Sequence, residues 1–401
     1  MAETVQQSLL LRNARLVLPE QVVEGGIIVI EQGRIASISE LDAGGGVLSD
    51  GILDLENLTV YPGFIDVHIH GAVGIDMMEA SAADIAHVAQ FLATQGVTGW
   101  LPTLVPAPLE DYVRAVKAID YAMQSHLGAR ILGVHYEGPF LNSAQCGALR
   151  AQFFRTFSTI NDLDELPVFV FKAARHMITV APEIAGGIEL VRELNQRGWV
   201  VSIGHTRASF ELLDQAFEAG ARHMTHFMNA MAPLHHRAPG PIAWGLARDE
   251  VTCDIIADGI HLDTRILQLL LKIKRAHRLT LISDAVAAAG KGDGEYKIWG
   301  ETITVKEGRT SNAAGSIAGS VITMADSVRL MQSLGVSEVQ LARLAATNPA
   351  RLLGIDRDCG SIVEGKRANL VALDGDGKVV LTILDGAVVF DGRGSKVSTE
   401  H

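Results

Sequence analysis

The sequence predicts an α/β protein: a (β/α)8 TIM-type barrel with a small β-sandwich domain built from both termini. Between about residues 63 and 358, short runs rich in β-branched residues alternate with segments of helical period, which is the pattern of a parallel sheet. Eight such runs can be counted, and eight parallel strands fit a closed barrel. Both ends of the chain instead carry short strand-like runs separated by turns, which is typical of hairpins.

The two ends are expected to pair into one small sheet domain. Their strand-like runs lie at 9–18, 26–30, 34–38, 368–373, 379–384 and 386–390. The predicted division is 1–58 for the N-terminal part of the small β-domain, 59–358 for the barrel and 359–401 for the C-terminal part.

The eight barrel strands can be placed by residue number. They are predicted at 63–68, 97–103, 131–136, 177–181, 200–204, 223–226, 253–257 and 279–283. Helices are expected between them, for example at 81–95 and 207–219, each followed by a glycine that ends it. Residues 141–176, 227–250 and 286–319 read as long loops or insertions, the last with a hairpin over 296–309. Loops of such length usually shape a site.

The composition limits the classes of function. Of the 401 residues, 48% are hydrophobic and 20% charged, and the formal net charge is −12. This describes a soluble globular chain and argues against binding to nucleic acid or to an anionic membrane. Cys146, Cys253 and Cys359 form no CxxC pair, so neither a disulfide framework nor a thiolate zinc site is expected. Without a signal-like N-terminus or a long apolar run, the chain is predicted to be cytoplasmic with no membrane span.

His68 and His70 stand at the end of an apolar run. Side chains two residues apart on a strand point to the same face, so both imidazoles can reach one divalent ion. Gly71 beyond them leaves room for a ligand or another backbone. Taken alone, the pair is more often a structural feature than a metal site.

Other polar residues follow the remaining predicted strands in the same way. His135 and Glu137 end the third strand, His205 follows the fifth, His226 ends the sixth and Asp284 follows the eighth. The carboxyl ends of barrel strands converge on one mouth. Histidine and carboxylate are the ligands suited to Zn²⁺ or Fe²⁺, and an open site of this kind is catalytic. Any one histidine here could be structural, but the set predicts a metal site.

Seven short motifs in order resemble one enzyme family across nearly the whole chain. They are Pro62-Gly-Phe-Ile-Asp-Val-His-Ile-His-Gly71, His135-Tyr-Glu-Gly-Pro-Phe140, Ser202-Ile-Gly-His-Thr206, Thr225-His-Phe-Met-Asn-Ala-Met231, Ala257-Asp-Gly-Ile-His261, Ser283-Asp284 and Ala318-Gly-Ser320. The chain is similar to the N-acetylglucosamine-6-phosphate deacetylases of the amidohydrolase superfamily. The resemblance implies a barrel with a small β-domain, a homodimer, and hydrolysis of an N-acetyl amino sugar 6-phosphate to amine and acetate.

Carried over residue by residue, the resemblance implies a metal centre. Glu137, His205 and His226 match the ligands present throughout the family. His68 and His70 match the pair found in its two-metal members. One or two divalent ions are therefore expected per subunit, Zn²⁺ first and Fe²⁺ as the alternative.

The resemblance also implies residue roles in catalysis and binding. Asp284 is expected to be the general base. The alternative is that it serves only as a metal ligand. The backbone amides of Asn229 and Ala230 are expected to hold the phosphate, with Arg237 contributed across the dimer; without the family Arg237 would read as a solvated surface charge. The full set of expected substrate contacts is Asn229, Ala230, Arg237, Asp258, His261 and Gly319. His261 alone could equally be a structural histidine.

One position departs from the family. Where the family usually places a histidine after a glycine and a small residue, Gly147-Ala148 is followed by Leu149. Hydrolysis is still expected, but the exact sugar and acyl group are left open, and His176 or His235 could compensate. The alternatives are another amide hydrolase of the dihydroorotase or D-aminoacylase type, or a non-catalytic scaffold on the same fold.

Overall fold

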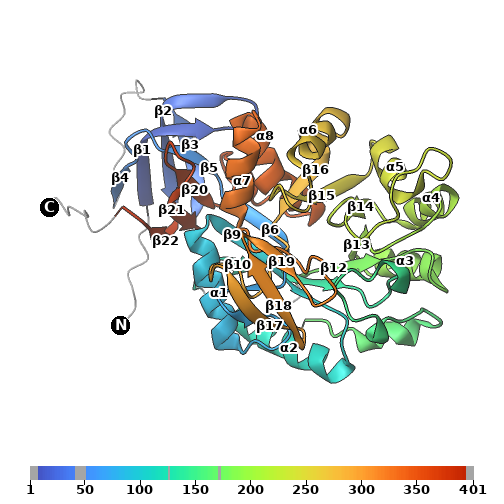
Figure 1. Cartoon of the computed structure of the whole chain (residues 1–401). Helices are drawn as coiled ribbons and strands as arrows, with labels where there is room; N and C mark the ends of the chain where they lie inside the picture. Colours follow the sequence, from blue (N-terminus) through green and yellow to red (C-terminus); the bar gives the residue numbers. More distant parts are fainter. Residues whose placement is uncertain (1–7, 41–50, 125–126, 170–172, 394–401) are drawn as a thin grey trace.

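The barrel and the small β-domain are both present in the computed structural model (Figure 1). The structure describes residues 8–40, 51–124, 127–169 and 173–393. Parallel pairing runs through the barrel strands in chain order. A parallel bridge from Ile69 to Ala285 joins the first strand to the segment after the last and nearly closes the barrel. The strands are β6 (Phe64–Ile69), β9 (Val97–Leu104), β11 (Gly133–Glu137), β12 (Arg175–Val180), β13 (Val200–Ile203), β14 (His223–Met224), β15 (Thr252–Ile256) and β16 (Leu279–Ile282), with the short β10 (Arg130–Ile131) beside β9.

The barrel strands are buried on both faces, which explains why they read as continuous apolar runs. All residues of β6, β9, β11 and β16 are buried. β14 is two residues shorter than predicted, because it ends at Met224 and not at His226. The backbone leaves the strand there because His226 adopts a positive φ of 29°, which is incompatible with an extended strand.

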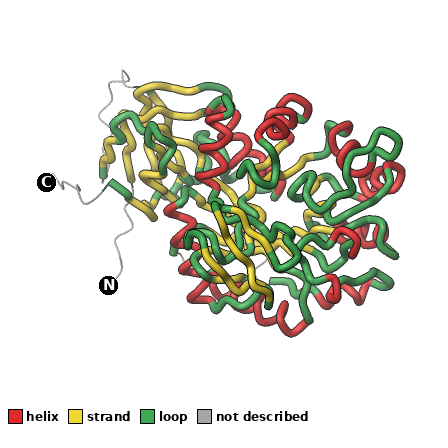
Figure 2. Tube along the Cα trace, viewed as in Figure 1, coloured by secondary structure: helices red, strands yellow, loops and turns green. Residues whose placement is uncertain are grey.

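Helices cover the outside of the barrel, as Figure 2 shows in red around the yellow strands. Local capping sets their starts: Ser81 and Asp84 form a capping box for α1, and Ser209 accepts from the Leu212 N–H at the start of α4. Because of that cap, α4 begins at Phe210, three residues later than the predicted 207. The helices are α1 (Ala82–Thr94), α2 (Leu109–Ala122), α3 (Gly187–Gln196), α4 (Phe210–Ala219), α5 (Gly240–Ala247), α6 (Thr264–Ile273), α7 (Met324–Ser333), α8 (Glu338–Ala342) and α9 (Asn348–Leu352).

Both ends of the chain pair into one mixed sheet, as predicted. Its strand order is β22-β21-β20-β5-β1-β2-β3, with β4 on β1, and the antiparallel β5–β20 pair joins the N-terminal and C-terminal parts. The small domain has its own apolar core. Its strands are β1 (Ser8–Val17), β2 (Val22–Glu31), β3 (Arg34–Ser39), β4 (Ile52–Asp54), β5 (Thr59–Pro62), β20 (Leu370–Leu373), β21 (Val379–Leu384) and β22 (Ala387–Asp391). Because β5 pairs within this sheet, the sheet extends to residue 62. The domain boundaries after residues 58 and 358 remain a prediction.

The three long insertions have short elements of their own. Residues 141–176 contain the turns Ser143–Gln145, Ala151–Phe153 and Ile160–Glu165. Residues 227–250 contain α5. The predicted hairpin is present and carries a third strand: β17 (Gly294–Ile298), β18 (Glu301–Lys306) and β19 (Arg309–Ser311). Among the described segments, no helix is both long and apolar enough to cross a membrane.

His176, at the start of β12, is a half-buried titratable group of the scaffold. Its ring stacks on Trp199 with centroids 4.9 Å apart, and Phe169 lies 5.4 Å away. Burial lowers the pKa of His176 from its ordinary 6.5 to about 4. Between these two pH values His176 is protonated in the unfolded chain but stays neutral in the folded one. Acidification from pH ~6.5 to ~4 therefore lowers the free energy of unfolding.

We expect His176→Phe to keep the stacking and to remove this pH dependence. The free energy of unfolding should fall by about 1–3 kcal/mol less in the variant than in the parent between pH ~7 and ~4. Denaturant melts across that range measure the difference. His87→Gln, at an exposed position of α1, is the control and should follow the parent. Parallel curves for His176→Phe and the parent would contradict the assignment.

Candidate metal centre

Five segments of the chain bring their polar side chains to one point at the carboxyl end of the barrel. His68 lies in β6 and His70 just after it, and Glu137 is the last residue of β11. His205, His226 and Asp284 each follow the end of β13, β14 and β16 by two residues. All six are buried, with at most 7% of the residue exposed. Two groups of three could each hold a metal ion: His68, His70 and Glu137, and Glu137, His205 and His226.

The carboxylate of Glu137 is the centre of the cluster. Its Oε1 lies 2.9 Å from His226 Nε2, 3.1 Å from His205 Nε2 and 3.6 Å from His68 Nε2. Its Oε2 lies 3.3 Å from His70 Nε2. The carboxylate is thus a member of both groups of three. One carboxylate shared by two ligand sets is an arrangement suited to two ions side by side.

The donor set fits a divalent metal. Within each pair of histidines the two Nε2 atoms lie close together. They are 3.2 Å apart in His68 and His70, and 3.0 Å apart in His205 and His226. Ligand atoms around a tetrahedral Zn²⁺ lie about 3.3 Å from one another, given Zn–N bonds of about 2.0–2.1 Å. Nitrogen and carboxylate ligands match the preference of Zn²⁺ or Fe²⁺.

Hydrogen bonds at the other ring nitrogen support Nε2 as the metal-facing atom of two histidines. His205 Nδ1 lies 2.8 Å from the carbonyl oxygen of Gln145, so Nδ1 carries the proton and donates it. His68 Nδ1 lies 3.1 Å from Thr225 Oγ1, a hydroxyl oxygen that can accept a hydrogen bond from it. A donor bond from Nδ1 fixes the tautomer in which Nε2 offers its lone pair to a metal.

The charge balance of the cluster favours a cation. Burial alone would raise the pKa of Glu137, but the neighbouring His68, His205 and His226 hold it well below its usual value. Burial alone would lower the pKa of His70 and of His226. Bonds to Asp284 and Glu137 instead raise the pKa of His70 to about 10, and Glu137 raises that of His226 to about 9. The carboxylates therefore stabilise positive charge between them, and a divalent ion meets the same demand.

Three of the six residues have a strained backbone. The φ angles of His205, His226 and Asp284 are 47°, 29° and 49°, in a region that residues other than glycine rarely occupy. Such conformations cost about 1–3 kcal/mol each and persist where the surrounding structure holds them. Their concentration at one point marks this end of the barrel as the functional one.

A fully buried pair, His223 and Asp254, holds the turn that carries His226. His223 Nε2 lies 3.0 Å from Asp254 Oδ2, and Asp254 Oδ1 accepts from the His226 N–H. The Asp254 carbonyl oxygen accepts from the Phe227 N–H at 2.8 Å. The sequence pattern did not indicate this pair, because an aspartate inside an apolar strand gives no periodic signal.

Glu183, after β12, joins the loop of Asn142 to the loop that follows His205 through hydrogen bonds. Its Oε1 accepts from Asn142 Nδ2 at 2.8 Å and from the Arg207 N–H at 2.6 Å, and its Oε2 accepts from the Thr206 hydroxyl at 2.6 Å. The Asn142 N–H in turn donates to the His205 carbonyl oxygen at 3.2 Å. Glu183 therefore positions His205 without touching the other ligands.

Asp66 anchors the opposite side of the cluster. Its Oδ2 accepts from the Ser283 hydroxyl at 2.6 Å, and its Oδ1 accepts from the N–H groups of His68 and Ser283, both at 3.3 Å. The Asp284 N–H donates to the His68 carbonyl oxygen at 2.9 Å. The metal-side ends of β6 and β16 are thereby tied together where the barrel closes.

The hairpin insertion reaches the same site. The indole of Trp299, between β17 and β18, packs edge-on against the His70 ring with centroids 5.1 Å apart. Gly319 lies beside Asp284, where a Cβ would come within 2.9 Å of the Asp284 carbonyl oxygen and 2.6 Å of Val286 Cγ1. Only glycine permits this close approach at a φ of 61°.

The other expected substrate contacts lie in loops at this end of the barrel. After β15, Asp258 Oδ2 lies 2.6 Å from His261 Nδ1, and Asp258 Oδ1 accepts from the His261 N–H at 2.8 Å. Burial would raise the pKa of Asp258, but His261 holds it below its usual value. His261 is therefore held by Asp258 and is not a lone residue.

The turn after β14 departs from one expectation. The Asn229 N–H donates to the His226 carbonyl oxygen at 2.9 Å, and Asn229 Nδ2 reaches the same oxygen at 3.2 Å. That backbone amide is therefore already engaged. Of the two backbone amides expected to bind the phosphate, that of Ala230, whose φ is 48°, is the one still available for an anion. Arg237 is exposed, and its guanidinium lies 2.7 Å from His236 Nε2 and not in the metal cluster.

Leu149 is 8% exposed and belongs to the main apolar core. Two residues earlier, a Cβ on Gly147 would lie 3.7 Å from His205 Cε1, so this loop borders the metal cluster. The expectation that His176 could replace a histidine here is wrong, because His176 begins β12 at the opposite end of the barrel. His235 is exposed in the loop before α5.

The chain is similar to known amidohydrolases over most of its length. Residues 59–389 match the model of the amidohydrolase family. The N-acetylglucosamine-6-phosphate deacetylase of Bacillus subtilis (strain 168) is 35% identical over 392 residues, covering 96% of this chain and 98% of the relative. The N-acetylgalactosamine-6-phosphate deacetylase of Escherichia coli O157:H7 is 34% identical over 366 residues, covering 91% and 94%.

Solved structures show the same likeness. The crystal structure of N-acetylglucosamine-6-phosphate deacetylase from Pasteurella multocida superposes with a TM-score of 0.87 at 30% identity, over 95% of this chain and 99% of that one. A mutant of the Mycobacterium smegmatis deacetylase in complex with N-acetyl-D-glucosamine-6-phosphate superposes with a TM-score of 0.86 at 31% identity, over 96% and 99%.

We expect Glu183→Gln to weaken metal binding at His205 without unfolding the protein. An amide keeps the size of the side chain but removes one of the acceptor positions that hold Thr206 and Arg207. Partners behind a metal ligand typically contribute about 10–100-fold in metal affinity. The measurement is metal content after dialysis against a graded chelator.

Glu189→Gln, at an exposed position of α3, is the matched control for the lost charge. Metal retention by Glu183→Gln equal to that of the parent would show that Glu183 does not position His205.

Proposed function

This chain belongs to the N-acetylglucosamine-6-phosphate deacetylase family of the amidohydrolase superfamily, and we propose that it hydrolyses the N-acetyl group of an amino sugar 6-phosphate. The substrate is N-acetylglucosamine 6-phosphate or a close relative, and the products are the amino sugar phosphate and acetate. One observation carries the proposal: four buried imidazoles converge on the carboxylate of Glu137, with Asp284 beside them. The intact donor set also speaks against the alternative of a scaffold without activity.

We propose Zn²⁺ as the resident metal, with Fe²⁺ as the alternative, because imidazole and carboxylate ligands suit both ions. When bound, such an ion lowers the pKa of its water toward ~7 and polarises an amide carbonyl. Glu137, His205 and His226 would hold one ion, and His68 and His70, with the same Glu137 carboxylate, would hold a second. Trp299 and the hairpin cover His70 and limit the access of bulk water.

Asp284 is the proposed general base. Its Oδ1 lies 3.2 Å from His70 Nε2 and 3.4 Å from His68 Nε2, so it borders the space where the ligands converge. Its backbone is held on both sides, since its carbonyl oxygen accepts from the Ser320 N–H at 2.7 Å. The carboxylate can take the proton of the attacking water and return it to the nitrogen of the leaving amine. Service as a metal ligand is compatible with the same position.

Substrate recognition is proposed to come from the loops around this point. The paired Asp258 and His261 would contact the sugar or its carbonyl oxygen, and Gly319 lets the 318–320 segment approach it. The Ala230 amide would contact the phosphate. We propose a homodimer in which Arg237 reaches the phosphate of the neighbouring subunit, because its loop is exposed and its guanidinium pairs only with a neighbouring histidine in the part of the chain that the structure describes.

The proposed location is the cytoplasm. Cys146, Cys253 and Cys359 are free thiols in the structure, and unpaired cysteines are common where the surroundings are reducing. We expect neither nucleic acid nor membrane among the partners, since the chain carries a net charge of −12.

Asp284→Asn should lower kcat by roughly 10²-fold or more, the usual scale for a lost general acid or base. An amide cannot accept the proton of the water. The fold and the ion held by Glu137, His205 and His226 should remain, so metal content and circular dichroism serve as controls. A kcat close to that of the parent would show that another group handles the proton.

Arg237→Ala should raise KM strongly for 6-phosphorylated substrates and little for unphosphorylated ones. The acidic chain gives no long-range attraction for a phosphate, so a local guanidinium has to supply it. Arg265→Ala, on the exposed surface of α6, is the control. An equal effect of Arg237→Ala on both substrate classes would mean that this residue does not read the phosphate.

The identity of the sugar is tested by kcat/KM for N-acetylglucosamine 6-phosphate, N-acetylgalactosamine 6-phosphate and N-acyl variants of both. Leucine cannot donate a hydrogen bond, which is worth about 0.5–1.5 kcal/mol net. We therefore expect N-acetylglucosamine 6-phosphate to be a slower substrate than another N-acyl amino sugar, and Leu149→His to shift preference toward it. If the parent already prefers it and Leu149→His leaves the ranking unchanged, the leucine is neutral; no turnover of any member would refute the deacetylase function.

A further inference from the structure

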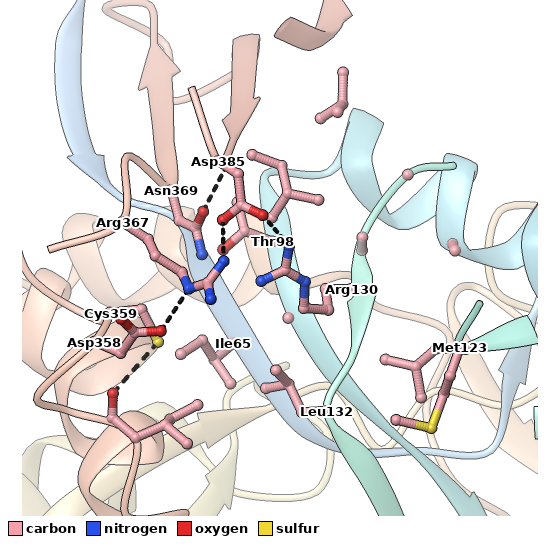
Figure 3. Close-up of a pocket in the computed structure, with 18 of the residues that line it drawn as sticks. Ile65, Thr98, Met123, Arg130, Leu132, Asp358, Cys359, Arg367, Asn369 and Asp385 are labelled. Atoms are coloured by element: carbon pink, nitrogen blue, oxygen red, sulfur yellow. Dashed lines mark hydrogen bonds and ion pairs between the residues drawn. The ribbon is translucent and has the colours of Figure 1, made fainter. Parts of the chain in front are cut away.

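A cavity of about 660 Å³ lies between the barrel and the small domain, at the end of the barrel opposite the metal cluster. It is bordered by the first residues of β6, β9, β10 and β12, whereas the metal ligands follow the last residues of their strands. Figure 3 shows Ile65, Met123 and Leu132 on its apolar side. Ligand pockets commonly have volumes of about 300–1,000 Å³ and occur at domain interfaces.

The polar lining of this cavity is rich in arginine. Arg130 and Arg367 converge on Asp385 from the barrel and the small domain, as Figure 3 shows, with 3.1 Å from Arg367 Nη1 to the carboxylate. Arg367 Nε and Arg34 Nη2 bind the other lining carboxylate, Asp358, at 2.5 and 2.8 Å. Both carboxylates are therefore shared between two guanidinium groups.

Two more guanidinium groups line the cavity without a carboxylate. Arg175 Nε donates to the Leu353 carbonyl oxygen at 3.0 Å. Arg357 is exposed and forms no hydrogen bond or ion pair within the described residues. The cavity is thus lined by four arginines and by two carboxylates that are already bonded. Its lining carries an excess of positive charge, although the net charge of the whole chain is −12.

We propose that this cavity is a second binding site, for an organic anion that has a carboxylate, phosphate or sulfonate group on an apolar body. The N–H groups of Arg357 and the Nη2 group of Arg175, whose Nη1 donates to the Ala173 carbonyl oxygen at 3.5 Å, match an oxyanion, since guanidinium donors bind such groups by charge-assisted hydrogen bonds. The apolar side takes the body of the ligand, because burying apolar surface is favourable. A sugar phosphate lacks that body, so the site differs in chemistry from the proposed active site and does not depend on the proposed function.

The test uses two fluorescent probes of nearly the same body, anilinonaphthalene sulfonate and its neutral counterpart phenylnaphthylamine. Both are titrated into the full-length, metal-loaded protein with the amino sugar phosphate product present at saturation, which blocks the active site. We expect one sulfonate probe per chain, bound about tenfold more tightly than the neutral one, because a charge-assisted bond of ~1.4 kcal/mol corresponds to tenfold in affinity.

Two variants locate the probe. Arg357→Ala should weaken binding of the sulfonate about tenfold and leave the neutral probe unchanged, whereas Arg351→Ala, an exposed arginine outside the cavity, should change neither. Ala387→Phe, at an exposed lining position, should fill the cavity and weaken both probes without changing deacetylation. Absence of sulfonate binding, equal affinity for the two probes, or sulfonate binding that survives both Arg357→Ala and Ala387→Phe would overturn the proposal.

Discussion

The structure depends on one carboxylate. Glu137 stands buried at the end of β11, and four imidazole nitrogens from three other parts of the chain lie 2.9–3.6 Å from its two oxygens. A buried charge without compensation is among the most unfavourable features a fold can contain. The carboxylates of Glu137 and Asp284 raise the pKa values of His70 and His226, and a bound divalent ion would meet the same requirement for positive charge.

Hydrogen bonds from neighbouring residues hold the backbone of the site in its strained conformations. His205, His226 and Asp284 each adopt a positive φ, and each is fixed through hydrogen bonds to a neighbour. Glu183 holds the loop of His205, Asp254 holds the turn of His226, and the Asp284 N–H is bonded to the His68 carbonyl oxygen. The barrel thereby converts residues more than 200 positions apart into one rigid ligand set, which is what catalysis by positioned groups requires.

The barrel could be predicted from the sequence because strands buried on both faces must be apolar runs. The convergence of the histidine and carboxylate side chains could be predicted because a polar residue at the end of such a run contributes little to apolar packing and lies at the mouth of the barrel. The end of β14 could not be predicted, because a strand of two residues leaves almost no pattern. Glu183 and Asp254 were missed for a different reason: their partners come from distant segments, so neither spacing nor periodicity indicates them. The engagement of the Asn229 amide likewise follows from the tertiary turn.

The central role of Glu137 is tested most directly by the metal content of the purified protein and two variants. Because Glu137 is shared by both ligand sets, Glu137→Gln should lose the metal of both, while His68→Asn should lose only the ion held with His70. Stoichiometry by elemental analysis, after exchange into metal-free buffer, separates the two results. Full metal content in Glu137→Gln would contradict the central role of this carboxylate, and with it the arrangement of the whole site.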